Sequence, residues 1–269
     1  MLRIFYRYCP EDRVGIRPTW FSKRLCLASF ALSVRNHLDR NRYGDEVEWR
    51  IFIDKTDALS VQEKEIIYSI SLAFKAKVDY LSTNSNAKSY LYILEEARVA
   101  DDNDRLLFVE DDYMWVTEAV YELIDAIDNI NGADYLTPYD HPVRYDEEYR
   151  GGADLPHWEN TIFLRGNRHY RSQESTCMTF MTSGKIIKKD FDLHRKYSLD
   201  NEKCPNDREL FRHLQRLGKY PDAGERRLLL GPMPSLATHA HMPFLAPIID
   251  WEKPIEEANQ YLYKLITST

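Results

Sequence analysis

The chain has 269 residues and a net charge of −7, from 36 basic and 43 acidic side chains. Hydrophobic residues make up 43% of it, enough to bury the core of one large α/β domain, which excludes a disordered or fibrous protein. The acidic balance argues against a generally basic nucleic-acid-binding surface. No apolar run approaches the ~20 residues that a membrane-spanning helix needs, and charge follows too early for a signal peptide, so we expect a cytoplasmic protein without a membrane span.

The cysteines and glycines exclude several common kinds of site. Cys9, Cys26, Cys177 and Cys204 are scattered without a CxxC pair, which argues against a zinc site or a disulfide framework. None of the 10 glycines falls in a GxxxxGK[ST], GxGxxG or GxSxG motif, and no HExxH is present. These absences remove the P-loop, Rossmann dinucleotide-binding, hydrolase and zinc-protease interpretations.

The first half of the chain alternates strand and helix patterns. In chain order we predict a strand at 2–8, a helix at 22–39, a strand at 47–53, a helix from 60 to 76, a strand at 78–81, a helix at 87–99, a strand at 106–109 and a helix at 116–130. Ser60 and Glu63 form a capping box at the start of the second helix. The run LLFV at 106–109 is wholly apolar and predicts the central strand of a sheet covered by helices on both faces.

The second half predicts less regular structure. After a strand at 135–137, the polar, aromatic and basic residues 138–175 are interpreted as loops and short strands over one end of the sheet. We then predict a strand at 177–182, a helix at 184–191, a helix at 207–217 and a closing helix at 254–269 with Pro254 at its first position. No repeat or linker marks a boundary, so we expect one α/β domain over 1–269 with a mixed, mostly parallel sheet.

Three acidic residues, Glu110, Asp111 and Asp112, directly follow the predicted central strand. Ligands bind at the carboxyl edge of open α/β sheets because loops from several strands converge there. Adjacent carboxylates repel one another, so a cation is their natural partner, and oxygen ligands suit Mg²⁺ or Mn²⁺ better than zinc. On an extended strand Glu110 and Asp112 would point one way and Asp111 the other. A solvated acidic turn is the alternative, and it is what we expect of the acidic residues at 101–104, before the strand.

A strand–helix sheet whose fourth strand ends in acidic residues resembles the nucleotide-sugar-dependent glycosyltransferases of the GT-A fold. The segment LLFVEDDYMW stands where that family has its Asp-x-Asp motif, and the similar order of elements covers roughly 2–241. The resemblance implies that Asp112 ligates Mn²⁺ or Mg²⁺. It also implies that Glu110 addresses the ribose or the outer shell of the metal, with Asp111 among the donor-binding residues.

Two later segments extend the resemblance. In inverting members the catalytic base is an acidic residue at the start of a downstream helix. In this chain the matching segment is PNDRELF, so the resemblance implies that Asp207 is the base, with Glu209 as the alternative. Asn206 and Glu209 are predicted to cap that helix reciprocally, so Asp207 has no capping role; its bland alternative is to favour the helix dipole. In SLATHAHM, a late histidine that completes the metal site or binds the diphosphate is implied to be His239, with His241 on the same side of an extended segment.

The resemblance also implies where the donor lies. The loop from residue 7 to Arg17 and Asp54 at the end of the second strand would embrace the nucleoside, and Lys88 near a helix N-terminus would offer a cation. Asp54 capping a turn and Lys88 as an ordinary surface lysine are the alternatives. Arg165, Arg168 and Arg171 would add positive charge at the diphosphate. Four aromatic side chains are expected to contact the sugar or the acceptor, and packing in the core is their alternative role. They are Trp115, His157, Trp158 and Tyr170.

We therefore predict a metal-dependent hexosyl- or pentosyltransferase that moves a sugar, with inversion, from a nucleoside-diphosphate sugar, with UDP favoured, to an acceptor hydroxyl. Residues 1–137 would form the nucleotide-sugar-binding half, 138–253 the acceptor and metal-completing half, and 254–269 the C-terminal helix. The acceptor would be a glycan, a small molecule or a hydroxylated DNA base, and the oligomeric state is left open. The alternatives are a sugar nucleotidyltransferase, which usually carries a glycine-rich N-terminal signature, and an inactive sugar-binding scaffold.

Overall fold

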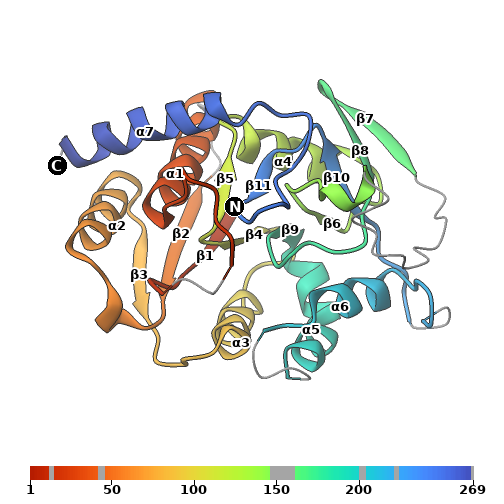
Figure 1. Cartoon of the computed structure of the whole chain (residues 1–269). Coiled ribbons are helices and arrows are strands. Elements are labelled where there is room, and N and C mark those ends of the chain that lie inside the picture. Colours follow the sequence, from red (N-terminus) through yellow and green to blue (C-terminus); the bar gives the residue numbers. More distant parts are fainter. Residues whose placement is uncertain (12–14, 42–45, 146–160, 200–203, 221–223, 268–269) are drawn as a thin grey trace.

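The computed structural model describes residues 1–11, 15–41, 46–145, 161–199, 204–220 and 224–267. One nine-stranded sheet runs through this part of the chain (Figure 1). Its strands lie in the order β3 (Lys77–Tyr80), β2 (Val47–Ile53), β1 (Leu2–Tyr8), β4 (Arg105–Glu110), β9 (Phe180–Ser183), β6 (Tyr135–Leu136), β10 (Leu229–Met233), β8 (Arg168–Ser172) and β7 (Ile162–Arg165). Strands β1 to β4 are parallel, whereas β9 and β8 run antiparallel to both of their neighbours. This is the predicted mixed, mostly parallel sheet.

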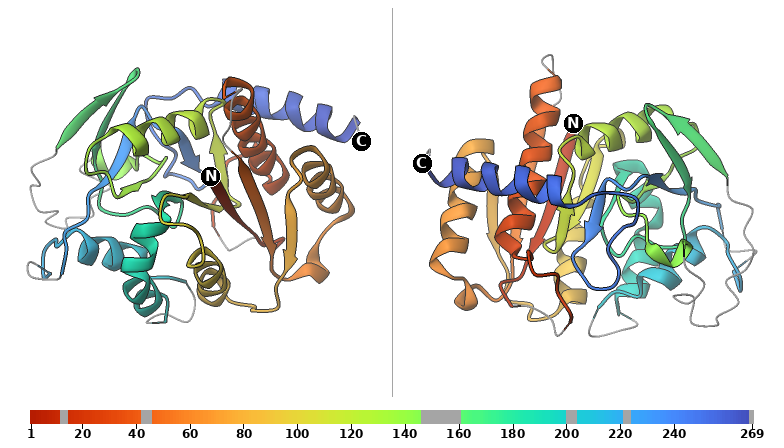
Figure 2. Two further views of the ribbon diagram at one scale, coloured as in Figure 1. Left: turned by 180° about the vertical axis from the view of Figure 1, so that it is seen from behind. Right: turned by 45° about the horizontal axis from the view of Figure 1, so that its top comes forward.

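Helices cover both faces of the sheet, as predicted (Figures 1 and 2). One layer consists of α1 (Lys23–Arg40), α2 (Val61–Phe74), α4 (Ala119–Asn129) and α7 (Glu252–Thr267). The other consists of α3 (Asn86–Ala97), α5 (Gly184–Leu199) and α6 (Asp207–Leu214), and short 3₁₀ turns occur at Thr56–Ala58 and Pro142–Arg144. Among the described residues no helix is long and apolar enough to cross a membrane.

The central strand β4 supplies side chains to both layers. Leu107 and Val109 belong to the buried cluster that contains the side chains of α1 and α4, and Leu106 and Phe108 belong to the cluster that contains those of α3 and α5. Successive side chains of a strand point to opposite faces, so a strand that is buried on both faces needs a continuous apolar run. The LLFV segment meets this need, and its predicted central position is confirmed.

The ends of several elements differ from the prediction. The capping box is confirmed, because the Ser60 hydroxyl accepts from the N–H of Glu63 and the Glu63 carboxylate accepts from the N–H of Ser60. The helix predicted from 184 to 191 continues to Leu199. The closing helix begins at Glu252, so Pro254 lies at its third position and not its first. Proline is tolerated there because the first N–H groups of a helix have no acceptor within it.

Strands β5 (Tyr113–Trp115) and β10 are missed by the sequence analysis. Strand β5 is only three residues long, and it pairs antiparallel with β11 (Ala237–His239) in a separate two-stranded sheet. Strand β10 contains Gly231 and Pro232, residue types that are depleted in strand interiors. The extended conformation expected around His239 is confirmed by β11.

The acidic loop before β4 is not wholly solvated, contrary to the expectation. Asp104 is only 5% exposed and accepts hydrogen bonds from Arg3 Nε at 2.7 Å and from the N–H of Asp101 at 3.1 Å. Strand β1 lies beside β4, so its Arg3 reaches the loop, a pairing that no local sequence pattern contains.

A buried histidine links three elements in the layer of α3 and α5. His194 of α5 meets the Tyr90 hydroxyl with Nδ1 at 2.7 Å and the Tyr135 hydroxyl with Nε2 at 3.1 Å. Tyr135 donates its hydroxyl hydrogen to Asp190 at 2.8 Å, so Nε2 of His194 donates and Nδ1 accepts from Tyr90. Burial lowers the pKa of His194 to about 4.

The depressed pKa of His194 predicts a loss of stability in mild acid. The unfolded chain binds this proton below a pKa of about 6.5 and the folded chain only below about 4, so the stabilisation is complete above pH 6.5 and is lost as the pH falls toward 4. The contribution to the free energy of unfolding should fall by about 2 kcal/mol between pH 7 and pH 5. Urea unfolding at both pH values measures it, with His194→Gln as the control that keeps one donor and one acceptor. An equal pH dependence in the variant would contradict the assignment.

Candidate active site

A pocket with a volume of about 630 Å³ lies at the carboxyl edge of β1, β2 and β4, where the sequence predicts ligand binding. The loop after β1, the N-terminus of α3 and strand β11 complete its wall. The polar residues of the wall that bear on its chemistry are Arg7, Arg17, Lys23, Asp54, Asn84, Asn86, Glu110, Asp111, Asp112, His239 and His241.

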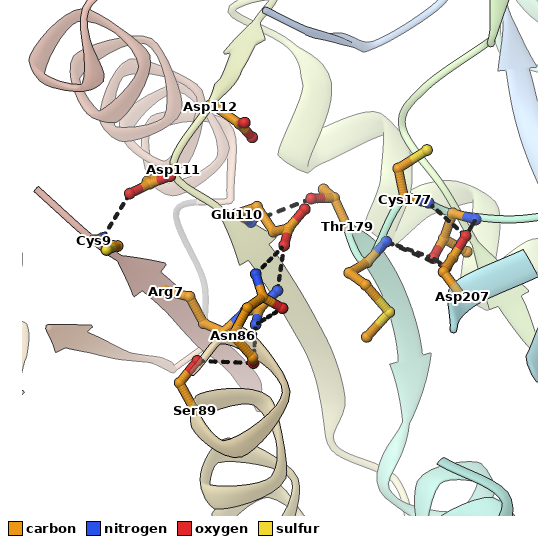
Figure 3. Close-up of polar contacts among 12 residues, drawn as sticks. Arg7, Cys9, Asn86, Ser89, Glu110, Asp111, Asp112, Cys177, Thr179 and Asp207 are labelled. Carbon is orange, nitrogen blue, oxygen red and sulfur yellow. Dashed lines mark hydrogen bonds and ion pairs between the residues drawn. The ribbon is translucent and has the colours of Figure 1, made fainter. Parts of the chain in front are cut away.

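The three carboxylates after the central strand have three different sets of partners. Figure 3 shows the contacts of Glu110 and the contact of Asp111 with Cys9. Strand β4 ends at Glu110, and residues 111–112 form a turn before β5. The strand alternation that would have aligned Glu110 with Asp112 therefore does not extend to Asp112. Each carboxylate has to be considered by its own contacts.

Glu110 ties three elements together. Its carboxylate pairs with Arg7 of β1, and Arg7 also donates to the backbone and side-chain oxygens of Asn86, at 3.1 and 3.2 Å, where α3 begins. The N–H of Glu110 donates to the Thr179 hydroxyl, just before β9, at 3.2 Å. Glu110 is thus held between β1, α3 and β9.

Asp111 anchors the loop after β1. Its carboxylate accepts from the N–H of Cys9 at 2.6 Å and forms an ion pair with Lys23 Nζ at 3.2 Å. Lys23, only 7% exposed, also donates to the backbone oxygens of Cys9 and Glu11. Burial raises the pKa of Asp111, and the charge of Lys23 opposes the rise.

Asp112 meets His239 in the wall of the pocket. Asp112 Oδ2 accepts from His239 Nε2 at 3.0 Å and from both terminal nitrogens of Arg17 at 3.1 Å, while Asp112 Oδ1 is buried and has no hydrogen-bond partner in the part of the chain that the structure describes. Burial alone would raise the pKa of Asp112, but His239 and Arg17 hold it well below its usual range. Burial likewise lowers the pKa of His239, and the Asp112 carboxylate outweighs that effect and raises it. The two side chains thus form an ion pair.

The pairing of β5 with β11 explains why residues 127 positions apart in the sequence meet. In this register His239 lies opposite Tyr113, their rings stack with centroids 5.2 Å apart, and the N–H of Ala240 donates to the backbone oxygen of Asp112 at 2.8 Å. His241 lines the same pocket and stacks on His239 at 5.8 Å, and burial lowers its pKa. Both histidines therefore face the pocket, as the spacing predicts.

Asp112 and His239 fit a divalent cation. Two ligand atoms at right angles, each about 2.1 Å from a metal, lie about 3.0 Å apart. His239 Nε2 and Asp112 Oδ2 are separated by 3.0 Å, so a cation that displaces the proton between them would find both ligand atoms in place, and Asp112 Oδ1, which has no partner among the described residues, adds a further oxygen. Within the described ranges no group of three or more His, Cys, Asp or Glu side chains is arranged to hold a metal. Mg²⁺ or Mn²⁺ held by two side chains would take its other ligands from water and phosphate oxygens.

The remaining predicted donor contacts have mixed outcomes. Arg17 lines the pocket, as does Asp54, whose carboxylate accepts from the N–H of Thr83 at 3.1 Å and of Asn84 at 3.3 Å. Asp54 therefore caps the turn before α3, which is its alternative role. Lys88 is exposed on α3 and does not line the pocket, so its alternative as a surface lysine agrees with the structure.

Asp207, the predicted catalytic base, is the first residue of α6 but does not line the pocket. Its carboxylate accepts from the N–H groups of Thr176, Cys177 and Met178 at 3.2, 3.1 and 3.3 Å, and from the Thr176 hydroxyl at 2.7 Å (Figure 3). Burial raises the pKa of Asp207, and these hydrogen bonds oppose the rise.

The predicted capping pair of the same helix is not formed. Asn206 makes no side-chain capping bond, and Glu209 instead accepts from the Tyr220 hydroxyl and pairs with Lys219, both at 2.7 Å. The predicted reciprocal cap is therefore wrong, and Asp207, which was predicted to have no capping role, accepts instead from the N–H groups of a turn distant in sequence.

The predicted arginine cluster is wrong as a source of charge for a diphosphate. Arg165 pairs with Asp125, Arg168 with Glu122 and Arg171 with the buried Asp140. Neighbouring elements supply these carboxylates, and none of the three arginines lines the pocket.

The predicted aromatic contacts are also corrected. Trp115 and Tyr170 are buried in the core at 2% and 1% exposure, because β5 and β8 turn these side chains inward. His157 and Trp158 lie outside the described residues. Two residues were not predicted: Lys23, whose only sequence signal is a charge at the start of a buried helix face, and the pairing role of Arg7, which with Arg3 is one of two charges in the otherwise apolar strand β1.

No family model matches the chain, and no curated protein matches it in sequence. Among solved structures it is similar to S. aureus TarS 1-349, with 13% identity and a TM-score of 0.45 over 85% of this chain, which spans 59% of that one. A 2-C-methyl-D-erythritol 4-phosphate cytidylyltransferase from Francisella tularensis gives 12% identity and a TM-score of 0.39, covering 96% of this chain and 99% of that one. Mouse xyloside xylosyltransferase 1 gives 11% and 0.35, covering 78% and 79%. Similarities of this size carry no argument about activity.

The contacts of Lys23 predict a large effect on stability. Lys23→Met should lower the free energy of unfolding by about 3 kcal/mol, because it leaves the carboxylate of Asp111 without its cation in a largely buried place. Urea unfolding measures this, and adding Asp111→Asn should recover part of the loss. Lys253→Met, which removes an exposed lysine 3.8 Å from Glu257, is the matched control and should change little. Equal effects of the two lysine substitutions would refute the anchoring role.

Proposed function

We propose that the chain is a metal-dependent glycosyltransferase whose donor is a nucleoside-diphosphate sugar. The observation that carries the proposal is the meeting of Asp112 and His239 at 3.0 Å, with Asp112 Oδ1 buried and unpartnered, in the wall of a pocket at the carboxyl edge of the sheet. The described part of the chain offers two side chains there, so a cation held by them would leave several positions for water and phosphate oxygens. The resemblance to GT-A glycosyltransferases points to the same pair.

The pocket has room and suitable chemistry for such a donor. A volume of about 630 Å³ falls in the range of small-molecule and cofactor sites, about 300–1,000 Å³. Phe52, Leu81 and Ile93 give one part of the wall an apolar character that suits a nucleobase. Asp112 and His239 give the other part a charged character that suits the diphosphate, with UDP as the favoured nucleotide.

The transfer breaks the bond between the anomeric carbon and the diphosphate oxygen and forms one from that carbon to the acceptor oxygen, and the proton of the acceptor hydroxyl passes to water. Mn²⁺ or Mg²⁺ held by Asp112 and His239 would neutralise the charge that develops on the departing diphosphate. Arg17, which lies beside Asp112 Oδ2, would donate to the same phosphate oxygens. The sugar, hexose or pentose, is transferred with inversion in this proposal, and NMR of the product's anomeric configuration tests that point.

The alternative activities separate by their products. A sugar nucleotidyltransferase would consume a nucleoside triphosphate and a sugar phosphate and release pyrophosphate, whereas the proposed enzyme releases a nucleoside diphosphate. An inactive scaffold would bind the donor without turnover. We propose a glycan or a small molecule as the acceptor. A hydroxylated DNA base should be tested as a third acceptor. Arg165, Arg168 and Arg171 are each paired with a carboxylate, so they give no support to DNA as the acceptor.

Asp112→Asn should abolish turnover and remove the Mn²⁺-dependent part of UDP binding, because the amide lacks the charge that attracts the cation. We expect at least a tenfold loss of affinity, roughly the effect of perturbing a metal site. Isothermal titration with UDP, with and without Mn²⁺, measures it, and EDTA should silence the wild type reversibly. Asp102→Asn, at an exposed acid on the opposite edge, is the control. Wild-type Mn²⁺ dependence in Asp112→Asn would remove the metal assignment.

The two histidines should differ in their effects. His239→Ala should weaken Mn²⁺-dependent UDP binding by about tenfold or more, because it removes one of two cation ligands. His241→Ala should have a smaller effect, since His241 lies one ring farther from Asp112. The same titrations compare them. Equal and negligible effects would return both side chains to a structural role.

A further inference from the structure

The turn that precedes β9 has an unusual backbone. Cys177 and Met178 both have positive φ, 48° and 57°, although neither is glycine. This left-handed conformation is unfavourable for residues with a Cβ atom and persists only where the surrounding structure enforces it. The turn lies between the acidic residues after β4 and the start of α6 (Figure 3).

The carboxylate of Asp207 holds the turn in this conformation. Consecutive N–H groups in such a conformation converge on one point and form an anion-binding concavity. The N–H groups of Thr176, Cys177 and Met178 all donate to the Asp207 carboxylate, and the Thr176 hydroxyl donates to it as well. The anion that this concavity binds is therefore an internal carboxylate.

The same turn contacts the candidate active site on two sides. The Thr179 hydroxyl accepts from the N–H of Glu110 at 3.2 Å. The backbone oxygen of Cys177 accepts from the Tyr113 hydroxyl at 3.3 Å, and the Tyr113 ring stacks on His239. A change in the turn at 176–179 would therefore displace Glu110 and, through Tyr113, His239.

We infer that Asp207 is a positioning residue: it fixes the turn at 176–179, which in turn places Glu110 and His239 for binding the metal and the diphosphate. The inference rests on the proposed function for what the site binds. A base would need its carboxylate at the acceptor hydroxyl, but both oxygens of Asp207 already accept from the turn. Moving the carboxylate away would leave three N–H groups without their acceptor.

Asp207→Asn separates positioning from base catalysis. The amide places an NH₂ group where an oxygen accepted, so the turn should relax. We expect the melting temperature to fall by about 4 °C or more and Mn²⁺-dependent UDP binding to weaken by about tenfold. The acidic limb of the pH–rate profile should stay in place. Glu209→Gln, at an acid on the same helix that faces Tyr220, should leave binding unchanged.

Two further variants test the route through the turn. Cys177→Gly removes the backbone strain at φ 48°, so it should be more favourable to stability in the wild type than in Asp207→Asn, where the relaxed turn no longer holds that strain, a coupling that a double-mutant cycle measures. Thr179→Val keeps the shape but removes the oxygen that accepts from Glu110, so it should reproduce the weaker Mn²⁺-dependent UDP binding.

The opposite pattern would overturn the inference. A base predicts that Asp207→Asn keeps its melting temperature and UDP affinity, loses about 100-fold or more in transfer rate and loses the acidic limb of the pH–rate profile. Absence of coupling with Cys177→Gly would also contradict the positioning role. If the wild type shows no Mn²⁺-dependent UDP binding, the proposed function fails, whereas the melting temperatures and the coupling still decide whether Asp207 fixes the turn.

Discussion

Three adjacent carboxylates at the end of a buried strand have to be neutralised, and the arrangement of the surrounding segments follows from that need. Glu110 pairs with Arg7 of β1, Asp111 with Lys23 of α1, and Asp112 with Arg17 and His239. Adjacent like charges in a partly buried place are unfavourable unless each has a partner. The partners come from the first strand, the first helix, the loop between them and a strand near the end of the chain, so charge pairing brings these segments to one edge of the sheet.

The sequence predicts the part of the fold that short-range patterns encode. The LLFV run, the capping box at Ser60 and the alternation of strands with helices all have local signatures, and the structure confirms them. Strand β10 could not be found because Gly231 and Pro232 mask it, and tertiary pairing rather than propensity makes it a strand. The predicted carboxyl ends of β1, β2 and β4 lie close to the observed ones, so the sequence placed the pocket at the correct edge of the sheet.

In the candidate site, contacts between residues distant in sequence are harder to predict than the residues themselves. The sequence predicts that Asp112 and His239 share a site, and their pairing is found, although it depends on the register of β5 with β11. It gives no hint that the Asp207 carboxylate meets a turn 30 residues earlier, because a helix N-terminus suggests a capping role or a catalytic role. It fails for Arg165 for the same reason, since the carboxylate that pairs with it belongs to α4. Apart from the pair of Asp112 and His239, the sequence identified charged residues without their partners, and Lys23 was not identified at all.

The charge balance of the pocket bears on whether its ligand arrives with a metal. Among the residues that the structure describes, its wall carries five carboxylates and four lysine or arginine side chains, which are Glu11, Asp54, Glu110, Asp111, Asp112, Arg7, Arg17, Lys23 and Lys55. The raised pKa of His239 adds a positive charge that brings the wall close to neutral. A diphosphate alone would meet no excess of positive charge there, and each cation it engaged would leave a carboxylate behind. A divalent cation bound by His239 displaces the proton of this side chain, so it adds one net positive charge as it enters with the diphosphate. That charge offsets part of the negative charge of the diphosphate, which makes the wall better suited to a metal–diphosphate complex than to the diphosphate alone.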